Sequence, residues 1–277
     1  MKNNFIKTIS IFLIIFESTK SNLNINIGPF LLVLCVGEKF LNKNIEIKKL
    51  LKTSFNLYLI YIFFNIVTIV LNYAFKGIII NNNESLKIIK ETLLLNGSYQ
   101  FNILIYIIVL ILLTSIFKFI ISKNKIIDSL ILIILLSLSL INDIFLLTLA
   151  YYLGYFFEKY ENKYLNFFII ILNIISFIFF KSYLSLLLPI LLYVFTKNIS
   201  KHINNYNINS FISFIDNKNF GIFLIYEIVL SLINLLNFNN TLSNNIGITI
   251  LTYLLSIIIV TRVSFLPIIN TLVKDRI

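Results

Sequence analysis

Long apolar segments follow one another along almost the whole chain, and they limit the folds that it can adopt. Hydrophobic residues make up 58% of the 277 residues and charged residues only 13%, with a mean hydropathy of +0.93. One soluble domain of this length has too little interior to bury so much apolar side chain. The sequence therefore predicts a protein whose main partner is the lipid bilayer.

Ten segments are apolar enough to be membrane-spanning helices, since a span needs roughly 20 apolar residues, and fewer where neighbouring helices shield it. Their ranges are 5–19, 24–41, 54–75, 101–121, 126–141, 144–158, 165–180, 182–197, 219–237 and 246–264. We predict an all-α fold, a polytopic membrane helical bundle of about ten transmembrane helices in a single domain, 1–277. Tight turns join the fifth segment to the sixth and the seventh to the eighth, so eight or nine spans are the alternative.

The distribution of charge indicates an orientation. With ten spans, most of the 23 lysines and arginines fall on the side of the two termini. Since cytoplasmic loops are enriched in these residues, we expect both termini to be cytoplasmic, in a multi-pass protein of a prokaryotic plasma membrane. The net charge of +11 is then explained by the topology. The sequence has no basic patch with base-stacking aromatic residues, so we expect no nucleic-acid partner. No small-residue cleavage site follows the first segment, so we expect a retained helix.

The chain has one cysteine, Cys35, and one histidine, His202. A single cysteine forms no disulfide within the chain, and no Cys/His cluster provides a metal site, so we predict no metal. His202 ends a basic stretch, 197–202, that reads as a solvated loop with only Lys, Asn and Ser nearby. Proton transfer within the membrane therefore has to use a side chain other than imidazole.

Carboxylates inside the apolar segments are the main candidates for a functional site, because charge is costly at membrane depth. Glu227 is the clearest case, since two helical turns of apolar residues precede it. Burial disfavours its charged form, and a neutral carboxyl suits a proton carrier or a general acid. Glu17 lies near the end of the first segment beside Lys20, where a solvated carboxylate is the alternative. Glu38 and Lys39 read as an interfacial pair.

Four stretches of the sequence resemble motifs of the acyltransferase-3 family of integral membrane acyltransferases, and the resemblance covers nearly the whole chain. They are 7–18 (KTISIFLIIFES), 28–41 (GPFLLVLCVGEKFL), 151–159 (YYLGYFFEK) and 219–226 (NFGIFLIY). The closing 264–267 (SFLP) is similar to the Pro-containing terminus of the family. The resemblance implies ten core spans and transfer of an acyl (acetyl) group from acyl-CoA to a carbohydrate or lipid-linked glycan outside the cytoplasm.

This chain departs from the family at its histidines. Ser18, or Glu17 beside it, stands where the family has a histidine at the end of its first span, and Tyr226 stands where it has a second. An imidazole titrates near neutral pH, whereas serine and tyrosine do not. The resemblance makes Glu17 and Glu227 the candidate catalytic residues, as substitutes for the missing base.

The same resemblance assigns acyl-CoA binding to three lysines. Lys7 matches an arginine of the first span, and Lys49 and Lys52 stand where the family has a basic pair. Lysine supplies positive charge for a phosphate, but without the bidentate geometry of arginine.

Two other functions remain open. The chain could be a catalytically inactive partner in envelope glycan assembly that keeps the ten-helix body. It could also be a proton-coupled transporter or flippase of a lipid-linked glycan in which Glu227 carries the proton, although the two halves show no matched broken helices.

Overall fold

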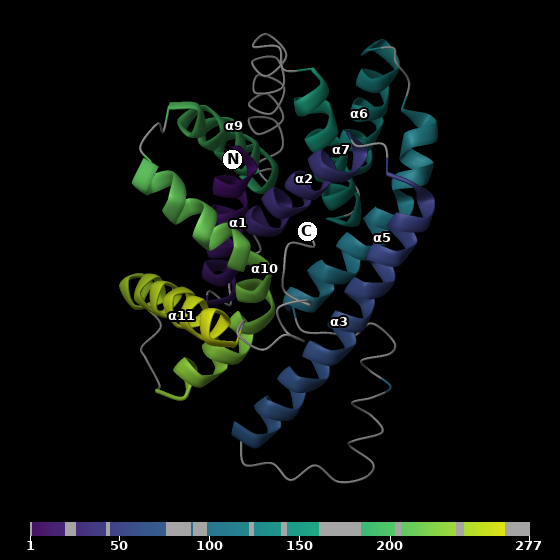
Figure 1. Cartoon of the computed structure of the whole chain (residues 1–277). Helices are drawn as coiled ribbons and strands as arrows, with labels where there is room; N and C mark the ends of the chain where they lie inside the picture. The colour runs from purple at the N-terminus through teal and green to yellow at the C-terminus, as the bar shows by residue number, and fades with distance from the viewer. Residues whose placement is uncertain are drawn as a thin grey trace.

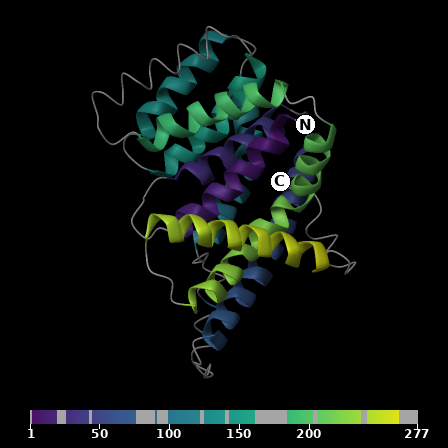
Figure 2. The same ribbon diagram turned by 90° about the vertical axis from the view of Figure 1, so that its left-hand side faces the viewer.

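The computed structural model describes nine stretches of the chain and the single residue 90. The stretches are 2–19, 26–42, 45–75, 99–121, 125–139, 143–160, 184–202, 206–236 and 241–263. Every regular element in this part of the chain is an α-helix (Figures 1 and 2). The helices are α1 (Lys2–Thr19), α2 (Ile27–Leu41), α3 (Ile47–Phe75), α5 (Tyr99–Ile120), α6 (Lys125–Ser139), α7 (Asp143–Lys159), α9 (Leu184–His202), α10 (Tyr206–Asn234) and α11 (Leu242–Val263).

The all-α prediction is confirmed for the described residues, and nine of the ten predicted segments coincide with a helix. The fifth and sixth segments are separate helices, α6 and α7, which pack against each other. The seventh segment, 165–180, lies outside the described residues. Three of the described helices, α3, α5 and α11, are long and apolar enough to cross a membrane. The ten-span topology and the side of the termini stay predictions.

The stretch between the eighth and ninth segments is largely helical, so its reading as a loop is wrong. Helix α9 continues through His202, and α10 begins at Tyr206, well before the predicted start at 219. The reason is an amphipathic pattern, in which Ile208, Phe211, Ile212 and Ile215 recur at helical spacing among polar residues. Such a stretch has too little mean hydropathy to read as a span.

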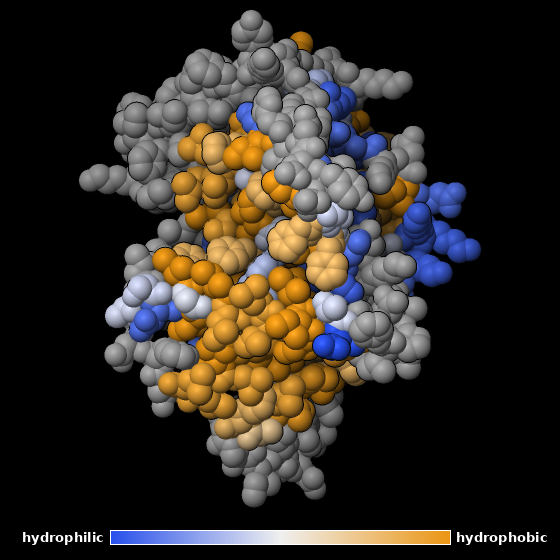
Figure 3. Space-filling view, turned by 60° about the vertical axis from the view of Figure 1, so that its left-hand side comes forward, coloured by the Kyte–Doolittle hydropathy of each residue, from blue (hydrophilic) through white to orange (hydrophobic). Residues whose placement is uncertain are grey.

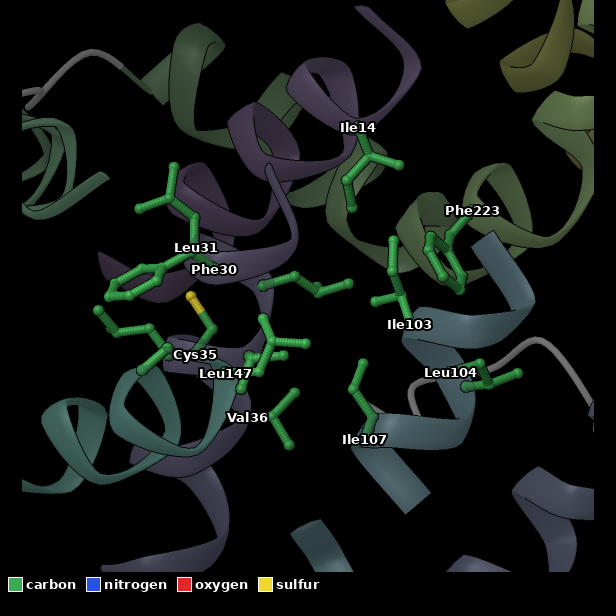
Figure 4. Packing of buried hydrophobic residues seen from close by; sticks show 14 of the residues in the cluster. Ile14, Phe30, Leu31, Cys35, Val36, Ile103, Leu104, Ile107, Leu147 and Phe223 are labelled. Atoms are coloured by element: carbon green, nitrogen blue, oxygen red, sulfur yellow. The ribbon is translucent and has the colours of Figure 1, made fainter. Parts of the chain in front are cut away.

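Helix α2 forms the centre of the bundle. Each of its 15 residues is buried except Lys39. It packs against α1, α5, α7 and α9, and Figure 4 shows side chains of its core, Phe30, Leu31, Cys35 and Val36, with residues of the surrounding helices. Pro29 lies in the first turn, where the missing N–H breaks no helical hydrogen bond.

Glycines allow the backbone of α2 to approach two other helices. A Cβ atom on Gly37 would overlap the carbonyl group of Tyr151 in α7, and one on Gly154 of α7 would overlap the carbonyl oxygen of Leu34. At the other end of α2, a Cβ on Gly28 would lie 2.6 Å from the backbone nitrogen of Ile14 in α1. Backbones this close leave no room for any side chain. The three glycines thus fix the positions of α1 and α7 around α2.

The outer helices expose apolar faces and bury polar side chains. Helix α3 exposes Ile47, Leu51, Phe55, Leu59, Phe63 and Val70, and it buries Ser54, Asn65 and Thr68. Helix α11 exposes Ile246, Ile250, Leu251, Leu254 and Ile258, and it buries Asn245, Thr249, Thr252 and Ser256. One such face forms a broad apolar area in Figure 3. This pattern is the reverse of a helix packed on a water-soluble core, and it is expected of helices solvated by lipid.

Candidate functional site

Helices α1 and α10 pack side by side and run in the same direction (Figure 1). Asn219 of α10 donates a hydrogen bond to Oγ1 of Thr8 at 3.0 Å, near the start of α1. At the other end of α1, Oη of Tyr226 lies 3.1 Å from Oγ of Ser18. The contact between α1 and α10 therefore joins Ser18 to Tyr226, the two positions singled out for their missing histidines.

The direction of the Ser18–Tyr226 hydrogen bond follows from the other bond that Ser18 makes. Ser18 Oγ donates its only proton to the carbonyl oxygen of Ile14 at 2.8 Å. The Tyr226 hydroxyl must then donate to Ser18. Tyr226 is fully buried and Ser18 is partly buried, so this pair is largely shielded from water. In this arrangement the protons of both hydroxyls are engaged in hydrogen bonds.

The Glu17 carboxylate binds the start of α2. Its Oε1 accepts hydrogen bonds from the backbone N–H groups of Ile27 at 2.8 Å and Gly28 at 3.1 Å. The residue at the N-cap of α2, Asn26, makes no capping bond with its own side chain. Glu17 therefore supplies from α1 the acceptor that the first turn of α2 needs, at the helix end that attracts negative charge.

Helix α11 adds a threonine to the same end of α1. Oγ1 of Thr249 lies 3.4 Å from Oγ1 of Thr19. Both hydroxyls donate to carbonyl oxygens of their own helices, Thr19 to Phe16 at 2.8 Å and Thr249 to Asn245 at 2.7 Å. We call Glu17, Ser18, Thr19, Tyr226 and Thr249 the α1 terminal site. It gathers side chains from three helices that are far apart in the sequence.

The structure brings together some of the predicted site residues and separates others. Glu17 belongs to the α1 terminal site, and Glu227 directly follows Tyr226 in α10, where it is half-buried. Lys7 is half-buried near the opposite end of α1, about 15 Å from Glu17 along the helix axis. Lys49 and Lys52 are exposed in the first turns of α3.

Two clusters of ionisable residues were not predicted from the sequence. In the first, the buried Glu38 of α2 accepts a hydrogen bond from Tyr193 of α9, at 3.4 Å from Oη to Oε2. Lys197, one turn further along α9, lies 3.4 Å from both Tyr193 Oη and Glu158 Oε2. The sequence pairs Glu38 only with its neighbour Lys39, because nothing in it indicates which helix lies opposite.

The second cluster ties α6 to α7. Asp128 of α6 is fully buried, and its Oδ2 accepts hydrogen bonds from Lys159 at 2.7 Å, Tyr155 at 3.2 Å and Tyr160 at 2.6 Å. Burial raises the pKa of Tyr160, and the hydrogen bond to Asp128 raises it further, so this phenol remains a donor. A carboxylate at the start of one apolar segment and a lysine at the end of the next was the signal available in the sequence.

Several buried polar atoms have no hydrogen-bond partner among the residues that the structure describes. They include the side-chain oxygens of Asn65, Thr68, Thr252 and Ser256 and both amide atoms of Gln100. Asn65 and Thr68 lie on the inner face of α3, and Gln100 lies in the first turn of α5, which packs against α3. Most buried polar groups are paired, so this many unpaired atoms indicate an interior with unused capacity for hydrogen bonds.

The fold of the described residues defines the class of this protein, an all-helical protein with helices long and apolar enough to cross a membrane. Comparison of the chain with protein-family models, curated proteins and solved structures gives no match. The resemblance to the acyltransferase-3 family therefore stays a prediction. Within the described residues, no group of three or more His, Cys, Asp or Glu side chains is placed to hold a metal ion.

Proposed function

We propose that the protein is an integral membrane O-acyltransferase of a prokaryotic plasma membrane, with ten spans and cytoplasmic termini. It would transfer an acyl group from acyl-CoA to a hydroxyl of an extracytoplasmic carbohydrate. The observation that supports this proposal is the 3.1 Å contact between Ser18 and Tyr226. The resemblance placed the two missing histidines at Ser18, or Glu17 beside it, and at Tyr226, in motifs at opposite ends of the chain, and Ser18 and Tyr226 lie in contact.

The reaction needs a base that the two hydroxyls do not provide. The acceptor hydroxyl attacks the thioester carbonyl carbon, an ester C–O bond forms, and the C–S bond breaks. The hydroxyl proton passes to a carboxylate and from there to the CoA sulfur, giving free CoA thiol. Glu227, beside Tyr226, is the residue we assign to this step. The Tyr226 hydroxyl would turn from Ser18 to donate to the carbonyl oxygen as negative charge develops there.

Glu17 has a different part in this proposal. Because its Oε1 binds two N–H groups of α2, it holds the end of α1 against α2 and thereby positions Ser18. Lys7, at the other end of α1, would bind a phosphate of acyl-CoA from the opposite side of the bundle.

The test is thiol release from acetyl-CoA by the purified chain, with and without a panel of sugar acceptors. Cys35 is the only cysteine and is buried, so the protein itself contributes little thiol signal. We expect Glu227→Gln and Tyr226→Phe to lower the rate at least tenfold, whereas Glu46→Gln, which alters an exposed carboxylate, should leave it unchanged. Tyr226→His restores an imidazole and should raise the rate.

No thiol release by the wild type and by Tyr226→His, in preparations whose unfolding temperature shows a folded chain, would contradict the proposal. It would favour the catalytically inactive partner in glycan assembly.

The second candidate is a proton-coupled transporter or flippase of a lipid-linked glycan. The unpaired polar atoms of Asn65, Thr68 and Gln100 favour it, because a pathway for a polar substrate has to offer hydrogen bonds inside an apolar body. It predicts substrate movement in proteoliposomes that a protonophore abolishes, with no release of CoA thiol.

A further inference from the structure

The start of α3 carries three exposed lysines, Lys48, Lys49 and Lys52. Among the residues that the structure describes, their ammonium groups make no hydrogen bond or ion pair. One acidic residue, the exposed Glu46, lies next to them. Within the described part of the chain, this turn and a half of helix therefore presents excess positive charge to a ligand.

An apolar stripe lies beside these lysines. Ile47, Leu51 and Phe55 are 63%, 55% and 61% exposed, and their spacing of four residues places them on one face of α3. The stripe continues along the helix through Leu59 and Phe63. Lys48 and Lys52 each follow a stripe residue directly, so they lie about 100° around the helix from the stripe.

Helix α5, which packs against α3, also exposes apolar side chains at this end of the two helices. The rings of Tyr61 in α3 and Phe101 in α5 are 6.0 Å apart, and the two helices run in opposite directions (Figure 1). The last turn of α5 therefore lies toward the start of α3. It exposes Ile116 and Phe119, and Phe119 is 92% exposed. The lysines thus border an apolar face of α3, and α5 exposes further apolar side chains nearby. Both helices are among the described helices that are long and apolar enough to cross a membrane.

We propose that this surface binds an anionic phospholipid, with its phosphate at Lys48, Lys49 and Lys52 and its acyl chains along Leu51, Phe55 and Leu59, toward the predicted span. Lysine stems lie along apolar surface while their ammonium groups reach the headgroup level. A soluble phosphate compound would match the charge but would leave the apolar stripe uncovered. The inference goes beyond the proposed acyltransferase function and does not depend on it.

Native mass spectrometry of the purified full chain in detergent tests the proposal, with phosphatidylglycerol and phosphatidylcholine as probes. We expect tighter binding of phosphatidylglycerol. Replacing the three lysines by glutamine should weaken phosphatidylglycerol binding roughly fivefold per lysine and on the order of 100-fold in total, with little effect on phosphatidylcholine. The difference should shrink at high salt, because exposed charges are screened.

Three further variants separate charge, lipid and nonspecific effects. Replacing the same lysines by arginine should retain binding, and Lys90→Gln with Arg262→Gln, at exposed positions elsewhere, should leave it unchanged. Phe55→Ser should weaken phosphatidylglycerol binding without altering any binding of inorganic phosphate.

Equal affinity for the two lipids would overturn the proposal. So would a site that binds CoA or inorganic phosphate as tightly as the lipid, with the same dependence on the lysines, since the surface would then recognise soluble phosphate.

Discussion

Gly37 of α2 lies directly against the carbonyl group of Tyr151 in α7, with no space between the two backbones for a methyl group. Gly154, about one turn along α7, makes the reciprocal contact with Leu34. Each helix thus places a glycine against the backbone of the other. The positions of α2 and α7 depend on two missing side chains.

Gly37→Ala and Gly154→Ala should therefore destabilise the protein strongly. The obstacle is backbone, which cannot turn aside as a flexible side chain can, so the two helices would have to separate. We expect a loss of about 3 kcal/mol or more for each variant, at the upper end of the cost of overpacking. A thiol-reactive dye in a thermal ramp measures this, because buried Cys35 becomes accessible only on unfolding.

Gly247→Ala is the matched control, because a Cβ at this position in α11 would meet nothing within 4 Å. We expect it to be neutral or to stabilise the chain by up to about 1 kcal/mol through helix propensity. Equal unfolding temperatures for all three variants would show that the close contact between α2 and α7 does not exist.

Replacing Lys159 should destabilise the protein more than replacing its ion-pair partner Asp128. Lys159→Met leaves a fully buried carboxylate without its cation. We expect the free energy of unfolding to fall by about 3 kcal/mol, the lower end of the usual range, since two tyrosines still donate to the carboxylate. Asp128→Asn leaves a lysine that is 27% exposed and can reach water, so we expect only about 1.5–3 kcal/mol. Denaturation of both variants in one detergent gives the comparison, and a larger loss for Asp128→Asn would contradict it.

Glu17 should stabilise the protein by accepting the hydrogen bonds of the N–H groups at the start of α2. Glu17→Ala removes the acceptor of two N–H groups, and we expect a loss of about 1–2 kcal/mol. Glu17→Gln keeps an acceptor oxygen and loses only the charge at the helix end, so its loss should stay below about 1 kcal/mol. Circular dichroism follows this unfolding, since the chain has no tryptophan. Equal losses for Ala and Gln would show that the charge, and not the acceptor, holds α2.

A double-mutant cycle should detect the contact between Ser18 and Tyr226. Ser18→Ala and Tyr226→Phe each remove one partner of the hydrogen bond, and we expect a coupling energy of about 0.5–1.5 kcal/mol. Thr8→Val with Tyr226→Phe is the control pair, because Thr8 bonds Asn219 at the other end of α1. Coupling in the control as large as in the test pair would mean that the effect is not local.

Hydropathy was sufficient to find the helices, because a segment without polar interruptions has few alternatives to a helix in lipid. It was insufficient at 206–218, where amphipathic spacing, and not mean hydropathy, makes the first turns of α10 helical. Hydropathy does not predict which helices pack against each other. No local pattern indicates that Glu38 contacts Tyr193. For Asp128 and Lys159 the one signal was their positions at the start and end of successive apolar segments.

The α1 terminal site illustrates the same limit. Glu17 was selected as an ionisable residue near the end of an apolar segment, and its bonds to Ile27 and Gly28 depend on how the chain turns after α1. The contact between Ser18 and Tyr226 was not predicted from the sequence, where the resemblance marked each position only as one at which the family has a histidine. Thr249 had no such signal, since a threonine in an apolar helix commonly bonds its own backbone.

The burial of α2 has a consequence for how this protein is made. Its 15 residues extend only about 22 Å, less than the roughly 30 Å of a bilayer core, and neighbouring helices cover it on all sides. Such a segment gains little from lipid by itself and depends on partners that the ribosome has yet to synthesise, α7 above all. We expect α2 to reach its final depth late in biogenesis, when α7 arrives and the glycine contacts close.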